Sequence, residues 1–356
     1  MQMVHDYPFM QERSLVGVIG ASGYSGGELV RLLLGHPGVE LAAVGGASSA
    51  GSRLDQIHPH LSGTPVAGLV LAPAEEVGGV DVAFLALPHG MSSKLAPTLL
   101  DAGTRVIDLG GDFRLPAFAY PAWYGFEHPA PAWLDKAVYG LPELFRDQIL
   151  GAELVANPGC YPTPVALGMA PLLSAGLVGA EPILVDGKTG LSGAGRRSTE
   201  ATSYAVTEES VRPYRFPAHQ HTPEMERVLE LSSGLAPSIS FVPHLVPSVR
   251  GVLVTCYARA AAGATTEELT DVLVRAYADE PFVRVLPAGG MVDTKRTRGS
   301  NVVELQAAVD PRTGTAVVAG ALDNLVKGAA GQAIQNLNLL IGLAETTGLP
   351  ATAVYP

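Results

Sequence analysis

The chain has few cysteines and few basic residues, and both shortages exclude classes of protein. Only two of the 356 residues are cysteines, Cys160 and Cys256, and neither lies in a C-x-x-C or zinc-finger spacing. A disulfide framework and a structural metal site are therefore not expected. Lysine and arginine number 23 against 34 acidic residues, which gives a net charge of −11. We expect no nucleic-acid partner, because such a chain offers no basic face for a phosphate backbone.

Long apolar runs are also missing. No stretch reaches the length of a membrane span, and residues 1–13 have no apolar core of the kind that a signal peptide needs. We therefore expect no membrane partner and a cytoplasmic location. What the chain does have is a hydrophobic fraction of 47% with only 16% charged residues, and enough length for two packed domains.

The first part of the chain alternates between strand-like and helix-like segments. LVGVI (15–19) is a short β-branched run, and GELVRLLLGHPG (27–38) has leucines at helical spacing. A further apolar run at 40–44 completes a βαβ unit, and the alternation continues through 81–110. We therefore expect an α/β fold with a doubly wound parallel sheet.

After Cys160 the strand-like segments become longer, which predicts a mixed α+β second domain. The clearest of them are 182–190, 238–246, 250–260 and 302–310. The last tract, Asp323 to Leu343, is rich in small residues and predicts a long helix, apolar on one face, that returns to the first domain.

A glycine-rich turn follows the first predicted strand. GASGYSGG (20–27) reads G-x-x-G-x-x-G and lies between a strand and a helix. Glycines let such a turn close and let backbone N–H groups approach a pyrophosphate at the helix N-terminus. An ordinary tight turn is the alternative, but the position favours a dinucleotide site. The expected cofactor contacts are Gly20, Ser22, Gly23, Tyr24, Ser25 and Gly26.

The end of the second strand bears on the choice between NAD and NADP. Residues 44–53 (VGGASSAGSR) contain no Asp or Glu to accept the ribose hydroxyls of NAD. Hydroxyls at Ser48 and Ser49 and the cation of Arg53 suit a 2′-phosphate, so NADP(H) is favoured. A solvated surface role for Arg53 stays open.

The segment NPGCYPTP (157–164) places Cys160 where a strand gives way to a predicted helix. Prolines in the first turn are compatible with a helix start, and the thiol would lie near the positive end of the helix dipole. A lowered pKa and a nucleophilic role are expected for Cys160. Cys256 lies in the middle of a predicted strand and fits a buried structural cysteine.

The best partner for a thiolate is the segment HQHTPE (219–224). Thr222 has the character of an N-cap and Pro223 that of a first helical residue, which would place His219 and His221 just before a helix. Either histidine could act as the acid/base, and a metal site lacks a third ligand at suitable spacing. The remaining candidates are assigned to structural or loop roles: His58, His60, His89 and His244.

Two further segments carry arginines in loops. Arg114 follows the strand at 105–110, where open α/β sheets bind ligands, and it could hold a phosphate. The loop 192–197 (SGAGRR) ends in paired cations. A solvated surface role is an equally good interpretation of both segments.

Taken together, several motifs closely resemble those of the N-acetyl-gamma-glutamyl-phosphate reductase family, a relative of the aspartate-semialdehyde dehydrogenases. The resemblance runs almost from end to end. The motifs are GASGYSGGEL (20–29), LPHG (87–90), DFRL (112–115), YGLPEL (139–144), NPGCYPT (157–163), SGAGR (192–196), HQHTPE (219–224), GSN (299–301) and DNLVKGAAGQAIQNLN (323–338). One departure is Gln220, where the family usually has arginine, and this leaves any substrate-binding role of that position in doubt.

The resemblance implies an NADPH-dependent reduction of an acyl phosphate through a cysteine thioester, with release of phosphate, in arginine biosynthesis. It implies a Rossmann-like domain, 14–160, completed by 323–356, and a catalytic and dimerisation domain, 161–322, in a homo-oligomer, a dimer or tetramer. By the same resemblance Cys160 is the nucleophile and His219 the acid/base. Ser192, Gly193 and Asn324 join the cofactor site, and the substrate site comprises Arg114, Asn157, His221 and Glu224.

Three other hypotheses remain at this point. A related enzyme of lysine synthesis reduces an aminoadipyl phosphate carried on a small acidic protein, although the acidic total of this chain weighs against such a carrier. A cysteine hydrolase could use Cys160 and His219 as a dyad, but the glycine loop would then have no purpose. A non-catalytic NADP sensor would tolerate the loss of Cys160.

Overall fold

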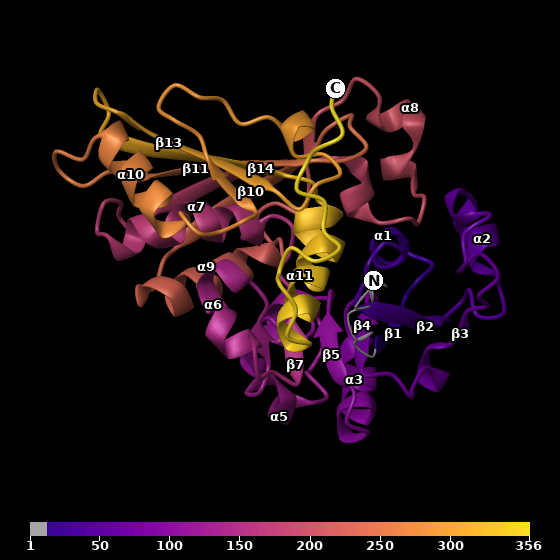
Figure 1. The fold of residues 1–356 in the computed structure, drawn as a ribbon. Helices are drawn as coiled ribbons and strands as arrows, with labels where there is room; N and C mark the ends of the chain where they lie inside the picture. Colours follow the sequence, from indigo (N-terminus) through magenta and orange to yellow (C-terminus); the bar gives the residue numbers. More distant parts are fainter. Residues whose placement is uncertain (1–12) are drawn as a thin grey trace, which may run out of the picture.

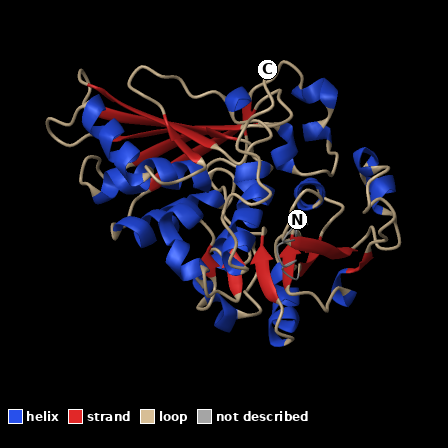
Figure 2. Ribbon diagram, in the orientation of Figure 1, coloured by secondary structure: helices blue, strands red, loops and turns tan. Residues whose placement is uncertain are grey.

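The computed structural model describes residues 13–356 and contains two seven-stranded sheets with helices between them (Figures 1 and 2). The predicted fold class, a doubly wound parallel sheet followed by a mixed α+β domain, is confirmed. Residues 1–12, which carry most of the segment assessed for a signal peptide, lie outside the described part. Within the described part no helix combines the length and the hydropathy needed to cross a bilayer.

The first sheet is parallel throughout, and its strand order reverses between β1 and β4. At such a reversal the two crossover connections leave on opposite faces and open a crevice at the carboxyl ends of the strands. In spatial order the strands are β3 (Ala72–Pro73), β2 (Val39–Gly46), β1 (Ser14–Ile19), β4 (Val82–Leu85), β5 (Arg105–Asp108), β7 (Leu154–Ala156) and β6 (Val138–Tyr139).

Both faces of this sheet are buried, which explains why its strands are almost wholly apolar. Side chains alternate along a strand, so Val82 and Phe84 of β4 pack into the cluster that holds α1, whereas Ala83 and Leu85 pack with α3. The helices around the sheet are α1 (Tyr24–Leu33), α3 (Ser92–Asp101), α6 (Pro142–Ile149) and the short α2 (Leu54–Ile57), α4 (Tyr120–Tyr124) and α5 (Pro131–Leu134).

The second sheet is mixed, and the helices of residues 13–356 that pack on it cover the face that is turned toward the first sheet (Figure 2). Along β8 the residues alternate between buried and solvent-facing, and Leu184 is 48% exposed. In spatial order the strands are β12 (Val283–Val285), β13 (Val303–Asp310), β14 (Thr315–Leu322), β11 (Val252–Arg259), β8 (Ile183–Thr189), β10 (Ile239–Leu245) and β9 (Arg212–Pro213). The helices are α7 (Pro162–Ser174), α9 (His221–Ser233), α10 (Thr266–Ala276) and the short α8 (Tyr204–Thr207).

The C-terminal tract forms a π-helical turn, Val326–Ala330, that continues into α11 (Gly331–Leu340). All ten residues of α11 are buried, so its polar side as well as its apolar side lies inside the protein. The tract packs against α1, α6 and β5 (Figure 1). Its polar side chains are buried with hydrogen-bond partners; Asn336, for example, donates to the carbonyl of Gly140 at 2.8 Å.

Candidate active site

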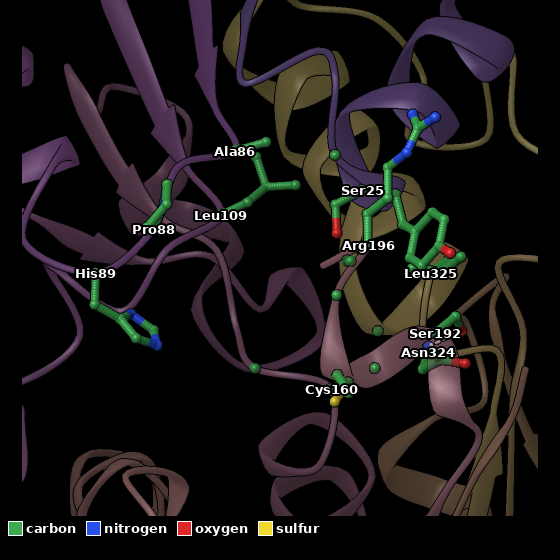
Figure 3. A pocket seen from close by; sticks show the side chains of 18 of the residues that line it. Ser25, Ala86, Pro88, His89, Leu109, Cys160, Ser192, Arg196, Asn324 and Leu325 are labelled. Atoms are coloured by element: carbon green, nitrogen blue, oxygen red, sulfur yellow. Dashed lines mark hydrogen bonds between the residues drawn. The ribbon is translucent and has the colours of Figure 1, made fainter. Parts of the chain in front are cut away.

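A cavity of about 640 Å³ opens at the strand-order reversal, between the glycine loop and the segment that carries Cys160. Its volume is in the range typical of small-molecule sites. Figure 3 shows Ser25 of the glycine loop on the same cavity as Cys160, with Ala86 and Leu109 along the opposite wall. The carboxyl ends of β1 and β4 and the start of α7 therefore border the same cavity.

The glycine loop closes tightly because its glycines lie against backbone. Gly20 has a φ of +93°, and a Cβ there would lie 2.2 Å from the carbonyl oxygen of Ala86. A Cβ on Gly26 would lie 2.2 Å from the carbonyl oxygen of Gly20. No side chain of residues 13–356 caps α1, whose N-terminus borders the cavity. The loop thus offers uncapped N–H groups at the positive end of a helix, which suits a pyrophosphate.

The residues assigned to the 2′-phosphate are distributed differently from expectation. Ser48 lines the cavity, but Ser49 and Arg53 do not, and Arg53 forms an ion pair with Asp55 at 2.7 Å. Arg196 instead covers this end of the cavity and donates to the carbonyl oxygens of Ser22 and Ile57 at 3.0 and 2.7 Å.

Cys160 lies two residues before α7, on a turn that is fixed from several sides. Gly159 donates its N–H to Oε1 of Glu224 at 2.7 Å, and Asn157 Nδ2 donates to the carbonyl oxygen of Ala329 at 3.1 Å. Gly328 of the π-helical turn packs directly on the cysteine, since a Cβ at that position would lie 2.9 Å from Cys160 Cβ. The turn that carries Cys160 is therefore held by contacts from α9 and from the π-helical turn.

The expected lowering of the Cys160 pKa is not found. Burial raises the pKa of this thiol to about 11, and the nearby Arg114 cation only partly opposes that rise. The start of α7 and one cation do not compensate for the loss of water around the sulfur. The free protein therefore keeps Cys160 mainly as a thiol near neutral pH.

His219 and His221 both line the cavity, 4.7 Å apart between ring centroids. The helix begins at His221, so the predicted N-cap at Thr222 is two residues late. The backbone N–H of His221 donates to Nδ1 of His219 at 3.1 Å. Burial, followed by the neighbouring His221, lowers the pKa of His219 to about 2, so the ring is neutral and its proton is on Nε2.

Arg114 and Glu224 form a buried ion pair next to the turn that carries Cys160. Arg114 Nη1 lies 3.0 Å from Oε2 of Glu224, and their side chains are 4% and 0% exposed. The other carboxylate oxygen accepts hydrogen bonds from Tyr139 and from the backbone of Gly159. Arg114 is thus fixed in position and lines the cavity, which contradicts the alternative of a solvated surface arginine and leaves its phosphate-binding role a prediction.

Asn324 reaches the cavity from the end of β14. Its Oδ1 accepts from the backbone N–H of Gly251 at 2.8 Å, and its Nδ2 donates to the hydroxyl of Ser192 at 2.9 Å. Figure 3 shows Ser192 and Asn324 together on the wall beside Cys160. The contact joins two segments that are far apart in sequence.

The structure brings most of the predicted site residues to one cavity. Fourteen of the eighteen line it, whereas Ser49, Arg53, Asn157 and Glu224 do not, although the last two hold residues that do. Sequence reasoning assigned no site role to four further lining residues, His89, Tyr214, Arg215 and Gln220, and it left Arg196 open between an anion-binding and a solvated role. His89 follows the carboxyl end of β4, and that position was the signal available for it.

Metal binding is not indicated by the geometry of the described part. Among residues 13–356 no group of three or more His, Cys, Asp or Glu side chains is arranged to hold a metal ion. His219 and His221 instead have aromatic neighbours, including Tyr161 at 6.1 Å from His219 and Phe241 at 5.3 Å.

Two family models match almost the whole chain. The semialdehyde dehydrogenase NAD binding domain matches residues 15–152, and the semialdehyde dehydrogenase dimerisation domain matches residues 160–324. The first match covers the sheet that bears the glycine loop, so this chain has a nicotinamide-cofactor domain. The second covers Cys160, the histidines and the mixed sheet.

Known proteins and solved structures agree with these models. The fold is similar to crystal structures of aspartate semialdehyde dehydrogenase II from Vibrio cholerae, complexed with ASA (TM-score 0.72, 18% identity, 93% of this chain and 99% of that one), and of the Candida albicans enzyme with NADP (TM-score 0.67, 16% identity, 92% of this chain and 98% of that one). The sequence is 50% identical to the N-acetyl-gamma-glutamyl-phosphate reductase of Symbiobacterium thermophilum and 47% identical to that of Brevibacillus brevis, over 96% of this chain and 99% of each relative. The chain therefore belongs to the N-acetyl-gamma-glutamyl-phosphate reductase family, within the semialdehyde dehydrogenases.

Proposed function

We propose that this protein reduces N-acetyl-gamma-glutamyl phosphate to N-acetylglutamate 5-semialdehyde and phosphate, in arginine biosynthesis. The observation that carries the proposal is the presence of Cys160, the glycine loop and the buried Arg114 on one cavity. Such a reaction needs a nucleophile, a loop that binds the dinucleotide, and a cation that binds the phosphate group.

In the first step the sulfur of Cys160 attacks the acyl carbon, the carbon–oxygen bond to phosphate breaks, and a thioester forms. The pKa of about 11 makes the free Cys160 a thiol, so its proton leaves with the phosphate as hydrogen phosphate. Arg114 lies close enough to Cys160 to oppose the rise of its pKa, and it is the cation best placed for the departing phosphate.

In the second step the thioester is reduced to the aldehyde and the cysteine is regenerated. NADPH, when bound at the glycine loop, supplies the hydride. His219 carries its proton on Nε2, because its Nδ1 accepts from the backbone of His221, and we assign that N–H as the donor to the acyl oxygen. The carbon–sulfur bond then breaks, the acyl oxygen becomes the aldehyde oxygen and gives its proton back to Nε2 of His219, and a proton from water converts the released Cys160 thiolate to the thiol.

We further propose NADP(H) rather than NAD(H) as the cofactor. The end of β2 offers Ser48 and no carboxylate, and Arg196 brings a cation over the same end of the cavity. The ratio of kcat/KM for NADPH and NADH checks this preference.

The domain division and the assembly also belong to the proposal. We assign residues 14–160 with 323–356 to the cofactor domain and 161–322 to the catalytic domain. The face of the second sheet that no helix covers exposes Leu184 and Tyr257, 48% and 37% exposed, and we assign it to contact with a second copy in a dimer or tetramer. Light scattering coupled to size exclusion measures the oligomeric state.

The reverse reaction tests the activity and its acyl specificity together. Purified protein is incubated with NADP, phosphate and either N-acetylglutamate semialdehyde or its analogue that is one carbon longer, and reduced nicotinamide is followed by absorbance. We expect phosphate-dependent reduction of NADP with the shorter aldehyde. Faster turnover of the longer analogue would favour the aminoadipyl alternative, and a lack of absorbance change with both would contradict a reductase.

The Cys160→Ser variant is the matched control. A serine hydroxyl is a weaker nucleophile at neutral pH, so reduction should fall by about 10³-fold or more while NADPH still binds. Turnover close to the wild-type rate would exclude the thioester route. Hydrolysis of the acyl phosphate without cofactor oxidation would indicate the cysteine hydrolase instead.

A further inference from the structure

Lys327, on the π-helical turn, is a fully buried charged side chain that the proposed chemistry does not use. Its Nζ lies 2.5 Å from Oε1 of Glu143 and 2.7 Å from Oε1 of Gln335, and 5.7 Å from the centre of the Phe282 ring. The side chains of Lys327 and Glu143 are both 0% exposed. Lysine and glutamate are almost never buried to this extent unless they are paired.

This ion pair is a poor device for stability alone. Removing two charges from water costs several kcal/mol per ion, and apolar replacements of such pairs are often neutral or stabilising. The compensation here is also incomplete, because Glu143 Oε2 has no hydrogen-bond partner among the described residues. A reason other than the net energy of the pair is therefore needed for Lys327.

The position of Lys327 supplies that reason. Its neighbour Gly328 packs on Cys160, since a Cβ there would lie 2.9 Å from Cys160 Cβ. The next carbonyl, of Ala329, accepts the hydrogen bond of Asn157, three residues before the cysteine. Both Gly328 and Ala329 line the cavity. The π-helical turn is thus the wall beside the sulfur, and π-turns within helices are frequent at functional sites.

Lys327 holds the π-helical turn in place, because it contacts residues that pack with the first sheet and residues that pack with the second. Glu143 belongs to the first turn of α6, against the first sheet, and Phe282 lies next to β12 of the second sheet. Gln335 extends the contact, because it also accepts from Nδ2 of Asn301 at 3.0 Å. A buried charge with directional hydrogen-bond partners can fix one position of the π-helical turn, whereas apolar packing would allow several positions.

We propose that Lys327 is a positioning residue for the reductase reaction: its buried pair with Glu143 sets the π-helical turn against Cys160 and so aligns the sulfur with the acyl carbon. The inference rests on the proposed function. Such a residue acts on kcat, because the turn touches the nucleophile, and it leaves the affinity for NADPH and the KM for the acyl phosphate nearly unchanged.

The test separates positioning from stability with two variants. Lys327→Met leaves Glu143 buried without its cation and should lower the Tm. The double variant Lys327→Met with Glu143→Leu replaces the pair by apolar side chains and should recover the Tm. We expect kcat to stay roughly 10-fold to 100-fold below wild type in both, since a displacement near 1 Å costs about that much. KM and the Kd for NADPH should remain within about twofold of wild type.

A matched control and a milder variant complete the design. Arg146→Met removes two ion pairs that lie nearer the surface, with Glu280 at 2.7 Å and Glu345 at 2.6 Å, and kcat should stay within about twofold of wild type. Gln335→Met removes one acceptor of Lys327 and should give an intermediate loss of kcat. Wild-type kcat in the apolar double variant, or an equal loss in Arg146→Met, would overturn the proposal.

A second readout keeps the inference separate from the proposed function. The rate at which iodoacetamide alkylates Cys160 depends on the position and surroundings of the sulfur, and its measurement needs no substrate. We expect the apolar double variant, once its Tm is restored, to differ from wild type by at least threefold in this rate. An unchanged alkylation rate would overturn the positioning role, whatever the reductase assay shows. A wild-type protein that fails the reductase assay would overturn only the proposed function.

Discussion

The two ends of the cavity are built in different ways. At the nucleotide end, the loop from Gly20 to Gly26 brings the backbone at the uncapped N-terminus of α1 to the cavity. At the catalytic end, Cys160, Arg114 and Glu224 come from three separate segments and meet only in the folded chain. A site made of backbone can be predicted from residue spacing, whereas a site made of buried side chains depends on partners that spacing does not reveal.

The largest expected effect concerns the catalytic end and its burial. With a pKa of about 11 for Cys160, the thiolate fraction should rise about tenfold per pH unit, so alkylation by iodoacetamide should accelerate roughly 10³-fold between pH 7 and pH 10. Stopped-flow or mass-spectrometric kinetics of labelling measure this profile. Labelling of Cys160→Ser reports the contribution of Cys256, whose pKa burial raises to about 12.

A plateau of the labelling rate near pH 7 would contradict this account. It would show that the helix start and Arg114 outweigh burial, as the sequence pattern alone predicts. The properties of the catalytic end could then be predicted from the sequence as well as those of the glycine loop, and the difference between the two ends would disappear.

The second prediction removes one charge at the catalytic end. Glu224→Gln leaves Arg114 buried without a carboxylate and weakens the acceptor of Tyr139 and of the Gly159 N–H. We expect kcat/KM to fall roughly 100-fold, because the turn that carries the nucleophile shifts, and stability to fall by about 3 kcal/mol. Steady-state kinetics and urea unfolding measure the two losses.

Glu226→Gln is the control on the same helix, because Glu226 is only half-buried and accepts from the backbone of Ile239. It should change kcat/KM by less than about threefold. Equal losses in the two variants would mean that α9 as a whole, and not the pair with Arg114, supports the catalytic end.

What the sequence predicted follows the same division between local and assembled features. The parallel sheet could be predicted because β4, with Val82 to Leu85 apolar on both faces, reads as a buried strand. The environment of Cys160 could not, because Gly328, far along the chain, packs against it. The burial of the polar side of α11 could not be predicted for the same reason, since helical spacing does not show that Gly140 and Glu143 accept hydrogen bonds from Asn336 and Gln335.

The third prediction tests the nucleotide end. Gly26→Ala puts a Cβ 2.2 Å from the carbonyl oxygen of Gly20, so the loop must open. We expect the Kd for NADPH to rise about tenfold and stability to fall by about 1–3 kcal/mol. Gly23→Ala is the matched control for stability, because its Cβ would meet the same oxygen at an ordinary 3.5 Å. An equal loss of stability in both variants would mean that backbone packing does not set the loop.

The smallest expected effect distinguishes two arginines at the nucleotide end. The sequence pattern assigns the 2′-phosphate to Arg53, but the Arg53 side chain pairs with Asp55 and lies outside the cavity lining, whereas Arg196 is in that lining. We therefore expect Arg196→Ala to raise the Kd for NADPH about threefold to tenfold with little change for NADH, because a 2′-phosphate loses one charged hydrogen bond. Arg53→Ala should leave both affinities within about twofold, since an exposed ion pair contributes little. Fluorescence titration with the two nucleotides decides between them, and a larger loss in Arg53→Ala would show that local sequence pattern identifies this contact better than the folded geometry does.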